Sequence, residues 1–414
     1  MPFYNFPGIY IEERKTFPTT INPGRTGSLA VFSNYFPRGP LKKAVMVSSF
    51  AEFLKIFADP KNPSSFGAGI DTVYNLYLYF INGGGTAWVA RLGSGGIKAS
   101  TYINLGGDQG DYNVQVKAKN EGTWGNGLYV VFRLSNVNYG DSTRKYYDIV
   151  VQKSETDTTV LESFTGVSFY PDEVEQSYSY AAINNISNYI EFTLPPNPNP
   201  SNIAAYTASG SLSGGTNPTN DNLTSELLSS IFDTVDDILI FIAPEYEFDF
   251  SAVASYVISR KFAFGIVNVS GSLIETFSPS YLSDKIAVYY PKGYVYSPFT
   301  GALTPAAVSL AGAIAGKYIY TDTIYNVGRV PAGLGIGGLN GVAKLEELNL
   351  TEAAMGDLYN RGFNAIIHRP AEGIIIWGAR TLSNNAAERY INRRRLLDFV
   401  EKNIKDSLRW VNFE

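Results

Sequence analysis

The chain has 414 residues, carries 33 lysines and arginines against 38 aspartates and glutamates, and contains no cysteine. The missing cysteines exclude disulfides, thiolate zinc sites and cysteine catalysis, and a formal net charge of -5 provides no basic field that would hold nucleic acid. Charged residues make up 17% of the chain, below the ~25% that is usual in soluble proteins, while tyrosines and phenylalanines number 29 and 25. This composition favours either large protein–protein contacts or aromatic-rich β-sheet cores.

Residues 1–22 are predicted to form an extended arm. In the stretch PGIYIEERKTFPTTI (7–21), Ile9 and Ile11 point to one side and Tyr10 and Glu12 to the other, which is typical of a half-buried strand. No hairpin turn follows, so the strand has no partner nearby in the chain. The start also lacks the basic and apolar regions of a signal peptide, and no apolar stretch reaches the ~20 residues that span a bilayer. We therefore expect a soluble protein.

The next part of the chain alternates helices with strands. Ser49 and Glu52 have the spacing of a capping box at a helix start, and the glycines at 83–85 mark the end of a second helix. A later helix is expected over 304–318, with Pro305 at its start. Buried strands are expected at 26–34, 237–244, 262–269 and 285–290. This order predicts a mostly parallel sheet covered on both faces, in one discontinuous α/β domain of residues 23–97 and 216–330.

Two further units complete the predicted multidomain α+β and α/β architecture. Residues 98–215 alternate between apolar and polar positions and lack helical periodicity, so we expect a β-rich outer insertion. Residues 331–414 are predicted to form a C-terminal α+β domain with a helix capped by Thr351, two strands and a long last helix. On that last helix, the expected buried stripe is Leu397, Val400, Ile404 and Leu408, with Arg394, Glu401 and Lys405 outside.

Few residue patterns point to a chemical site. The stretch GLGIGG (333–338) matches a dinucleotide-binding fingerprint, but Pro331 breaks any preceding strand, so we expect a loop. His368, the only histidine, ends a strand and is predicted to be an edge or interface residue. Asp233, Asp236 and Asp237 could suggest a metal site, but they lie between a helix and a strand, where polar residues mark a boundary. Glu245, Glu247 and Asp249 follow the carboxyl end of a strand, the usual place for sites in open α/β sheets, but nothing else there looks catalytic. We expect no catalytic residue, metal or cofactor.

The last helix carries a cluster of cations. Its members include Arg393, Arg394, Arg395, Lys402 and Lys405, interspersed with acidic residues. One interpretation is a solvated helix face with internal ion pairs at i,i+4 spacing. The other is a positive face that meets an acidic partner, and the sequence leaves both open.

Several stretches together resemble the tail sheath proteins of contractile phage tails and of pyocin-like contractile injection particles. The similar motifs cover nearly the whole chain in the family's order: PGIYIEE, FINGGGTAWVARL (80–92), EGTWGNGLYV (121–130), SGSLSGGT (209–216), LNLTEAAMGDLYNRGFNAI (348–366), WGARTL (377–382) and YINRRRLLDFVEKNI with the final FE. WGARTL followed by INRRRLLDFVE is the most specific of them. Each other motif is weak when taken alone.

The resemblance implies a structural protein without enzymatic activity or cofactor. Sheath subunits stack as rings, expected to be hexameric, around a tail tube between a baseplate and a tail terminator. The sheath contracts to drive the tube through a target envelope during host cell entry and genome ejection. Such a protein is assembled in the bacterial host cytoplasm and resides in the virion tail, without inserting into membranes or binding nucleic acid.

The resemblance also assigns roles to residues. Ile9, Tyr10, Ile11 and Glu12 are expected to form an intersubunit strand that another copy completes by β-augmentation. The domain of residues 331–414 would face the tube, with Arg393, Arg394, Arg395, Lys402 and Lys405 as tube-facing candidates.

Two alternatives and one departure accompany this interpretation. The α/β domain is also compatible with a nucleotide- or carbohydrate-binding enzyme. The second alternative is a surface adhesin, which is compatible with the tyrosine, serine and asparagine content of residues 98–215. Family members usually continue past the final FE with a C-terminal arm. We therefore expect the chain to be either a trimmed fragment or a member of a short branch.

Overall fold

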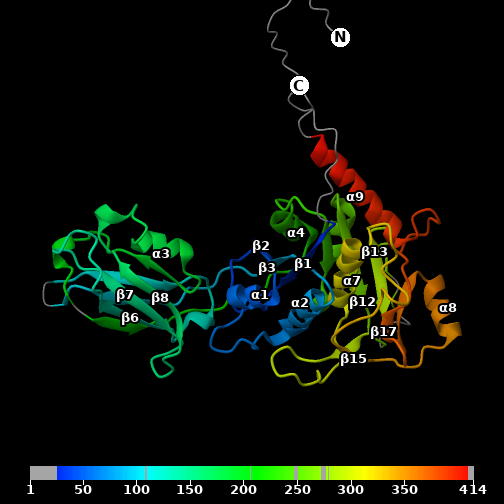
Figure 1. The fold of residues 1–414 in the computed structure, drawn as a ribbon, viewed down its shortest axis with the longest axis horizontal. Coiled ribbons are helices and arrows are strands. Elements are labelled where there is room, and N and C mark those ends of the chain that lie inside the picture. The colour runs from blue at the N-terminus through cyan, green and yellow to red at the C-terminus, as the bar shows by residue number, and fades with distance from the viewer. Residues whose placement is uncertain are drawn as a thin grey trace, which may run out of the picture.

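The computed structural model describes residues 26–107, 110–205, 207–246, 250–271, 277 and 279–408. Two parts lie side by side in Figure 1: a body built on one large sheet, and the insertion of residues 98–215, which contains β6, β7, β8 and α3. The predicted arm strand, with Ile9, Tyr10, Ile11 and Glu12, lies outside the described residues. None of the described helices is long and apolar enough to cross a membrane.

The body is organised around an eight-stranded sheet in the order β17-β16-β13-β12-β11-β1-β3-β2. The pairs from β3 through β1, β11, β12 and β13 to β16 are parallel, and the edge strands β2 and β17 are antiparallel to their neighbours. The mostly parallel sheet predicted from the alternation of elements is therefore confirmed. Its strands are β1 (Ser28–Ser33), β2 (Ala44–Val47), β3 (Ala87–Arg91), β11 (Leu239–Ile242), β12 (Ala263–Asn268), β13 (Ile286–Tyr290), β16 (Phe363–Arg369) and β17 (Gly373–Ile376).

Helices cover both faces of this sheet and bury its alternate side chains. One face packs against α1 (Phe50–Phe57), α2 (Ile70–Ile81) and α7 (Ala311–Ile324), around residues such as Val31 and Ile240. The other face packs against α4 (Ser225–Phe232), α5 (Ser251–Ser259) and α8 (Glu352–Asn360). The strands read as continuous apolar runs because both of their faces are buried.

Local capping explains where several helices begin. Ser49 accepts a hydrogen bond from the Glu52 amide at 3.1 Å, as predicted. The Glu52 carboxylate, however, bonds the amide and hydroxyl of Ser48 in place of the Ser49 amide. Thr351 caps α8 through the amide of Ala354, also as predicted. The expected helix start near Pro305 is wrong, since α7 begins only at Ala311. The sequence did not reveal this start because the helix is buried nearly all round and has no amphipathic pattern to mark its boundary.

The insertion has a hydrophobic core of its own, with Trp124, Phe132 and Tyr147 among its buried residues. The expectation that it lacks helices is wrong, since Ser179 caps the short helix α3 (Tyr180–Ile186) by accepting from the Ala182 amide. Seven residues are too few to display a helical repeat in the sequence. Its sheets are β10-β6-β7-β8 and β4-β5-β9, made of β4 (Ser100–Asn104), β5 (Asn113–Ala118), β6 (Tyr129–Leu134), β7 (Tyr147–Gln152), β8 (Val160–Val167), β9 (Ile190–Thr193) and β10 (Ala208–Ser211).

The sheet of the body continues past residue 331, where the sequence places the start of a C-terminal domain. Within 331–414, β16 pairs in parallel with β13, and β17 forms the edge of the same sheet. A small antiparallel pair, β14 (Gly293–Val295) with β15 (Val342–Leu345), also joins the two sides of that boundary. The long helix α9 (Ile391–Ser407) then projects beyond the body (Figure 1).

Candidate functional site

The last helix, α9, exposes most of its apolar side chains and buries several of its charged ones. Leu397, Val400, Ile404 and Leu408, the predicted buried stripe, are 47%, 42%, 42% and 50% exposed. Leu396, beside them, is 42% exposed. We call these five residues the apolar stripe. The prediction that they face the core is wrong, because the opposite side of the helix packs on the body.

The charged side of α9 is held by ion pairs to three other segments of the body. Arg395 is 4% exposed, and its guanidinium donates to the Asp322 carboxylate of α7 at 2.9 Å. Arg394 and Lys402 each pair with two carboxylates. Arg394 contacts Asp284 at 3.3 Å and also Asp398, and Lys402 contacts Asp236 at 3.0 Å and also Asp406.

These pairs overturn part of the prediction for the cationic cluster. A solvated basic face is wrong for Arg394, Arg395 and Lys402, since all three are buried or half-buried and paired within the chain. The i,i+4 ion pairs of the same interpretation are confirmed for Arg394 with Asp398 and for Lys402 with Asp406. Arg393 and Lys405 are exposed, and the ammonium of Lys405 lies 5.7 Å from the Phe262 ring centre. Of the five candidates for contact with a partner, these two remain on the surface.

Arg395 is the deepest anchor of α9, and it enters a buried polar network. Its guanidinium lies over the ring of Tyr318 at 4.9 Å, and the Tyr318 hydroxyl contacts that of Tyr289 at 2.5 Å. Burial alone would lower the pKa of Arg395, but the facing Asp322 carboxylate outweighs burial and raises the pKa above its ordinary value. Arg395 is therefore charged, and its position is fixed by α7 and β13.

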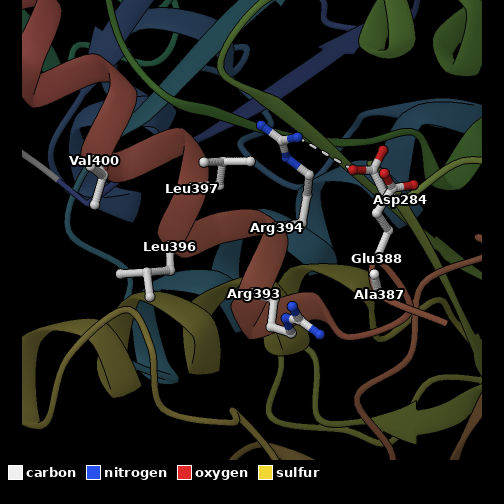
Figure 2. A pocket seen from close by; sticks show the side chains of 8 residues that line it. All are labelled: Asp284, Ala387, Glu388, Arg393, Arg394, Leu396, Leu397 and Val400. Carbon is white, nitrogen blue, oxygen red and sulfur yellow. Dashed lines mark hydrogen bonds and ion pairs between the residues drawn. The ribbon is translucent and has the colours of Figure 1, made fainter. Parts of the chain in front are cut away.

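A groove runs along the first half of α9 beside the apolar stripe (Figure 2). Its volume is about 520 Å³. Leu396, Leu397 and Val400 project from the helix, and Arg394 reaches across to Asp284. The complete lining is Asp284, Ala387, Glu388, Arg393, Arg394, Leu396, Leu397 and Val400. An apolar floor with charged residues of both signs at its rim is the anatomy of a protein-binding surface.

The first acidic group singled out from the sequence makes contacts within the body. Asp233 pairs with Arg260 at 3.5 Å, Asp236 with Lys402, and Asp237 accepts from the Ser28 hydroxyl at 2.6 Å. Among the residues that the structure describes, no group of His, Asp or Glu is arranged to hold a metal ion. Glu247 and Asp249 lie outside those residues.

Glu245 is the most perturbed carboxyl group at the carboxyl edge of the sheet. It follows β11 and accepts a hydrogen bond from the Thr72 hydroxyl at 2.6 Å, while its second oxygen is buried without a hydrogen bond. Burial raises its pKa to about 7, although hydrogen bonds from Ser33 and Thr72 oppose the rise.

The remaining sequence candidates are the GLGIGG stretch, which lies in a loop as predicted, and His368. The GLGIGG stretch forms turns, without the strand and helix that a dinucleotide site requires. His368 is exposed on β16, opposite Ile374 of the edge strand β17. The structure does not bring either feature together with another candidate residue.

The sequence did not reveal that α9 packs on the body with its charged face and leaves its apolar face exposed. The available signal was the alternation of opposite charges at i,i+4 spacing, Arg394 with Asp398 and Lys402 with Asp406, which marks one face as strongly charged. Sequence reasoning also missed two buried arginines, Arg38 and Arg91, which lie where the body meets the insertion. No local pattern distinguishes them from surface arginines.

Comparison with known proteins relates the chain to contractile sheaths. No family model matches it. Over 108 residues, 26% of the chain, it is 35% identical to the tail sheath protein of Vibrio phage KVP40, and this match spans 16% of that relative's length.

Solved structures resemble the chain over its full length. It matches the contracted helical sheath of the anti-feeding prophage with a TM-score of 0.54 at 19% identity, covering 100% of the chain and 78% of that protein. It matches the contracted sheath complex of the extracellular contractile injection system PVC with a TM-score of 0.53 at 16% identity, covering 100% of the chain and 77% of that protein. The likeness to these structures shows a shared fold. With that fold and a match over part of its sequence, the chain is similar to contractile tail sheath proteins.

Proposed function

We propose that the chain is a structural subunit of a contractile tail sheath. In this proposal copies polymerise as a helical cylinder around an inner tube, and the cylinder shortens to drive the tube through a target envelope. The observation that carries the proposal is the apolar stripe of α9, left exposed on a helix whose charged side is already paired within the chain. In a chain with the sheath fold, such a surface is suited to contact with other subunits.

The proposed partners are further copies of the chain, a tail tube protein, a baseplate and a tail terminator. Helical self-assembly is supported by the similar chain in the helical sheath of the anti-feeding prophage. A similar chain of that particle also lies in a baseplate structure symmetrised six-fold, with 18% identity and a TM-score of 0.52. We therefore propose rings of six subunits in a virion tail, assembled in the cytoplasm of the bacterial host.

Within this assembly we propose that Ile9, Tyr10, Ile11 and Glu12 form a strand completed by another copy. The alternation of their side chains favours a strand with one buried face, and strand addition supplies main-chain hydrogen bonds to a partner. The insertion of residues 98–215 would lie on the outside, where its separate core leaves the body's sheet intact. Residues 331–414 would face the tube.

Contact with the tube is proposed for Arg393 and Lys405, the two exposed cations of the cluster. Arg394, Arg395 and Lys402 would act indirectly, by holding α9 on the body through Asp284, Asp322 and Asp236. Exposed ion pairs are worth little singly, about 0–1 kcal/mol each, so such contacts would be easily released when a sheath rearranges. No observation favours the alternatives of an enzyme or an adhesin.

Charge substitutions in the apolar stripe test the proposal. We expect Leu397→Glu with Val400→Glu to abolish the formation of tubules or rings, because both side chains would be desolvated by a neighbouring subunit. Negative-stain electron microscopy and sedimentation velocity measure assembly. Ile186→Glu is the matched control, since Ile186 is 63% exposed in the insertion and far from α9 in the chain.

Two outcomes would contradict the proposal. The first is a double variant that assembles as well as the unaltered chain. The second is an unaltered chain that stays monomeric with and without a tube protein. The melting temperature of each variant should stay within a few degrees of the unaltered value, because substitutions at exposed positions change stability by about 0.5 kcal/mol.

A further inference from the structure

The body and the insertion have separate hydrophobic cores, but polar groups join them at a narrow junction. The core of the insertion shares no residue with the hydrophobic cores of the body. Two chain segments connect the parts, and they pair with each other: Ser94 with Thr219, Ile97 with Thr216, and Ser100 with Ser213. Two connecting segments without a shared apolar core would ordinarily allow relative motion of the two parts.

Arg38 of the body is buried against aromatic rings of the insertion. It is 1% exposed, and its guanidinium lies 5.1 Å from the ring centre of Trp124 and 4.5 Å from that of Tyr189. On the other side it donates to main-chain carbonyl oxygens at the end of α1, those of Ile56 at 3.0 Å and of Lys55. One guanidinium therefore contacts both parts of the molecule.

Arg91, at the end of β3, makes a second bridge. It is 2% exposed and donates to the carbonyl oxygen of Glu121 in the insertion at 2.8 Å and to that of Gly39 in the body at 3.3 Å. Burial lowers its pKa to about 10, so it is charged at neutral pH. Within the described part of the chain, neither Arg38 nor Arg91 forms an ion pair with a carboxylate.

The backbone around these arginines is closely packed. Gly122 of the insertion has φ of +136°, and a Cβ there would lie 2.9 Å from the Pro37 carbonyl oxygen and 3.3 Å from the Arg91 guanidinium. The Gly39 amide donates to the Asn120 side chain at 3.3 Å, and the Lys61 ammonium donates to the Asn126 carbonyl oxygen at 2.5 Å. Donors of the body thus meet acceptors of the insertion at several points.

We propose that Arg38 and Arg91 couple the insertion to the body, so that the two cores unfold as one cooperative unit and the insertion keeps one orientation. Buried guanidinium groups are costly unless other contacts compensate for the lost water. Arg91 donates to carbonyl oxygens of both parts, whereas Arg38 donates to carbonyl oxygens of the body and lies over two aromatic rings of the insertion. Separating the parts would remove the Glu121 acceptor from Arg91 and the rings of Trp124 and Tyr189 from Arg38. This coupling concerns the single chain and holds whether or not copies assemble.

Calorimetry and a distance measurement test the coupling. The chain lacks cysteine, so Ser230→Cys in the body and Glu155→Cys in the insertion, both at exposed positions, introduce two spin labels. For the chain with both arginines we expect one thermal transition and one narrow distance distribution. For Arg38→Met with Arg91→Met we expect two resolved transitions and a broadened distribution.

Milder variants keep the test decisive if the double variant fails to fold. Arg38→Lys retains the charge without the planar group that stacks on two rings, and Tyr189→Leu removes one of those rings from the insertion side. Both should broaden the distance distribution, and Arg133→Met, at an exposed position of the insertion, should leave it unchanged. Two transitions in the unaltered chain would overturn the proposal. So would one transition and an unchanged distribution in every variant that folds.

Discussion

The ion pair between Arg395 and Asp322 offers the sharpest test of how α9 is held. Asp322 has a fully buried side chain, and Arg395 is 4% exposed. At the 2.9 Å between the guanidinium nitrogen and the carboxylate oxygen, Coulomb attraction is about 6 kcal/mol for an effective dielectric constant of about 20. Much of this attraction only offsets the cost of removing both charges from water. Removing one partner therefore leaves the other charge buried, with its desolvation cost no longer offset by the attraction.

We expect Arg395→Met and Asp322→Leu each to lower the free energy of unfolding by about 3–5 kcal/mol, because each leaves one buried charge unpaired. The double variant should lose far less than the sum, since an apolar pair of similar volume replaces the ion pair. Urea denaturation followed by circular dichroism measures all four proteins. Arg393→Met is the control, and its exposed position predicts a change within about 0.5 kcal/mol.

Additive losses in this cycle would refute the reasoning. So would single variants that behave like the control, because the buried pair would then contribute nothing to the attachment of α9. A double variant that recovers stability would show that the network fixes the position of the helix without being a net source of stability. The apolar stripe should stay exposed in that variant.

Three further predictions follow from other parts of the chain. Deletion of residues 1–15 should leave the circular dichroism spectrum of the subunit intact and abolish assembly, whereas an unfolded subunit would place the segment in its own core. Arg393→Glu should weaken co-sedimentation with a tube protein at an unchanged melting temperature, and unaltered co-sedimentation would remove Arg393 from the tube contact. Burial raises the pKa of Glu245 from 4.5 to about 7, so the stability of the chain should fall as pH rises through this range. Between pH 4 and pH 8, the free energy of unfolding of Glu245→Gln, measured by urea denaturation, should rise by about 3 kcal/mol relative to that of the unaltered chain. If the two proteins show parallel pH profiles, the raised pKa of Glu245 is contradicted.

The fold of the body was predictable where the sequence signal is local. Strands such as β1 and β11 read as short apolar runs, because both of their faces are buried. Caps such as Thr351 act within one helical turn and were equally readable. The start of α7 was not, since eleven of its residues are buried and the helix has no polar face to give a period.

The candidate site was harder to predict because its determinants are distant in the sequence. Periodicity shows that α9 has one apolar and one charged face, but it does not show which face packs on the body. That choice depends on Asp322 and Asp284, which lie 73 and 110 positions before their arginine partners. The same holds for Arg91, whose acceptor, the carbonyl oxygen of Glu121, lies 30 positions away in the insertion. Long-range partners of buried charges are thus what single-sequence reasoning lacks.

The energetics of the apolar stripe constrain what kind of assembly it can support. Its five side chains are each roughly half exposed, and covering the exposed half of one contributes about 1 kcal/mol, so the stripe supplies about 5 kcal/mol in total. Association of two free proteins costs roughly 4–15 kcal/mol in lost motion alone. A pair of subunits joined only by this stripe would therefore be weak. When neighbours in a lattice are also linked by a second element, such as a strand added from residues 9–12, the stripe acts at high effective concentration and its contribution becomes sufficient. In the proposed assembly, the stripe therefore contributes to a stable contact between subunits only together with such a second element.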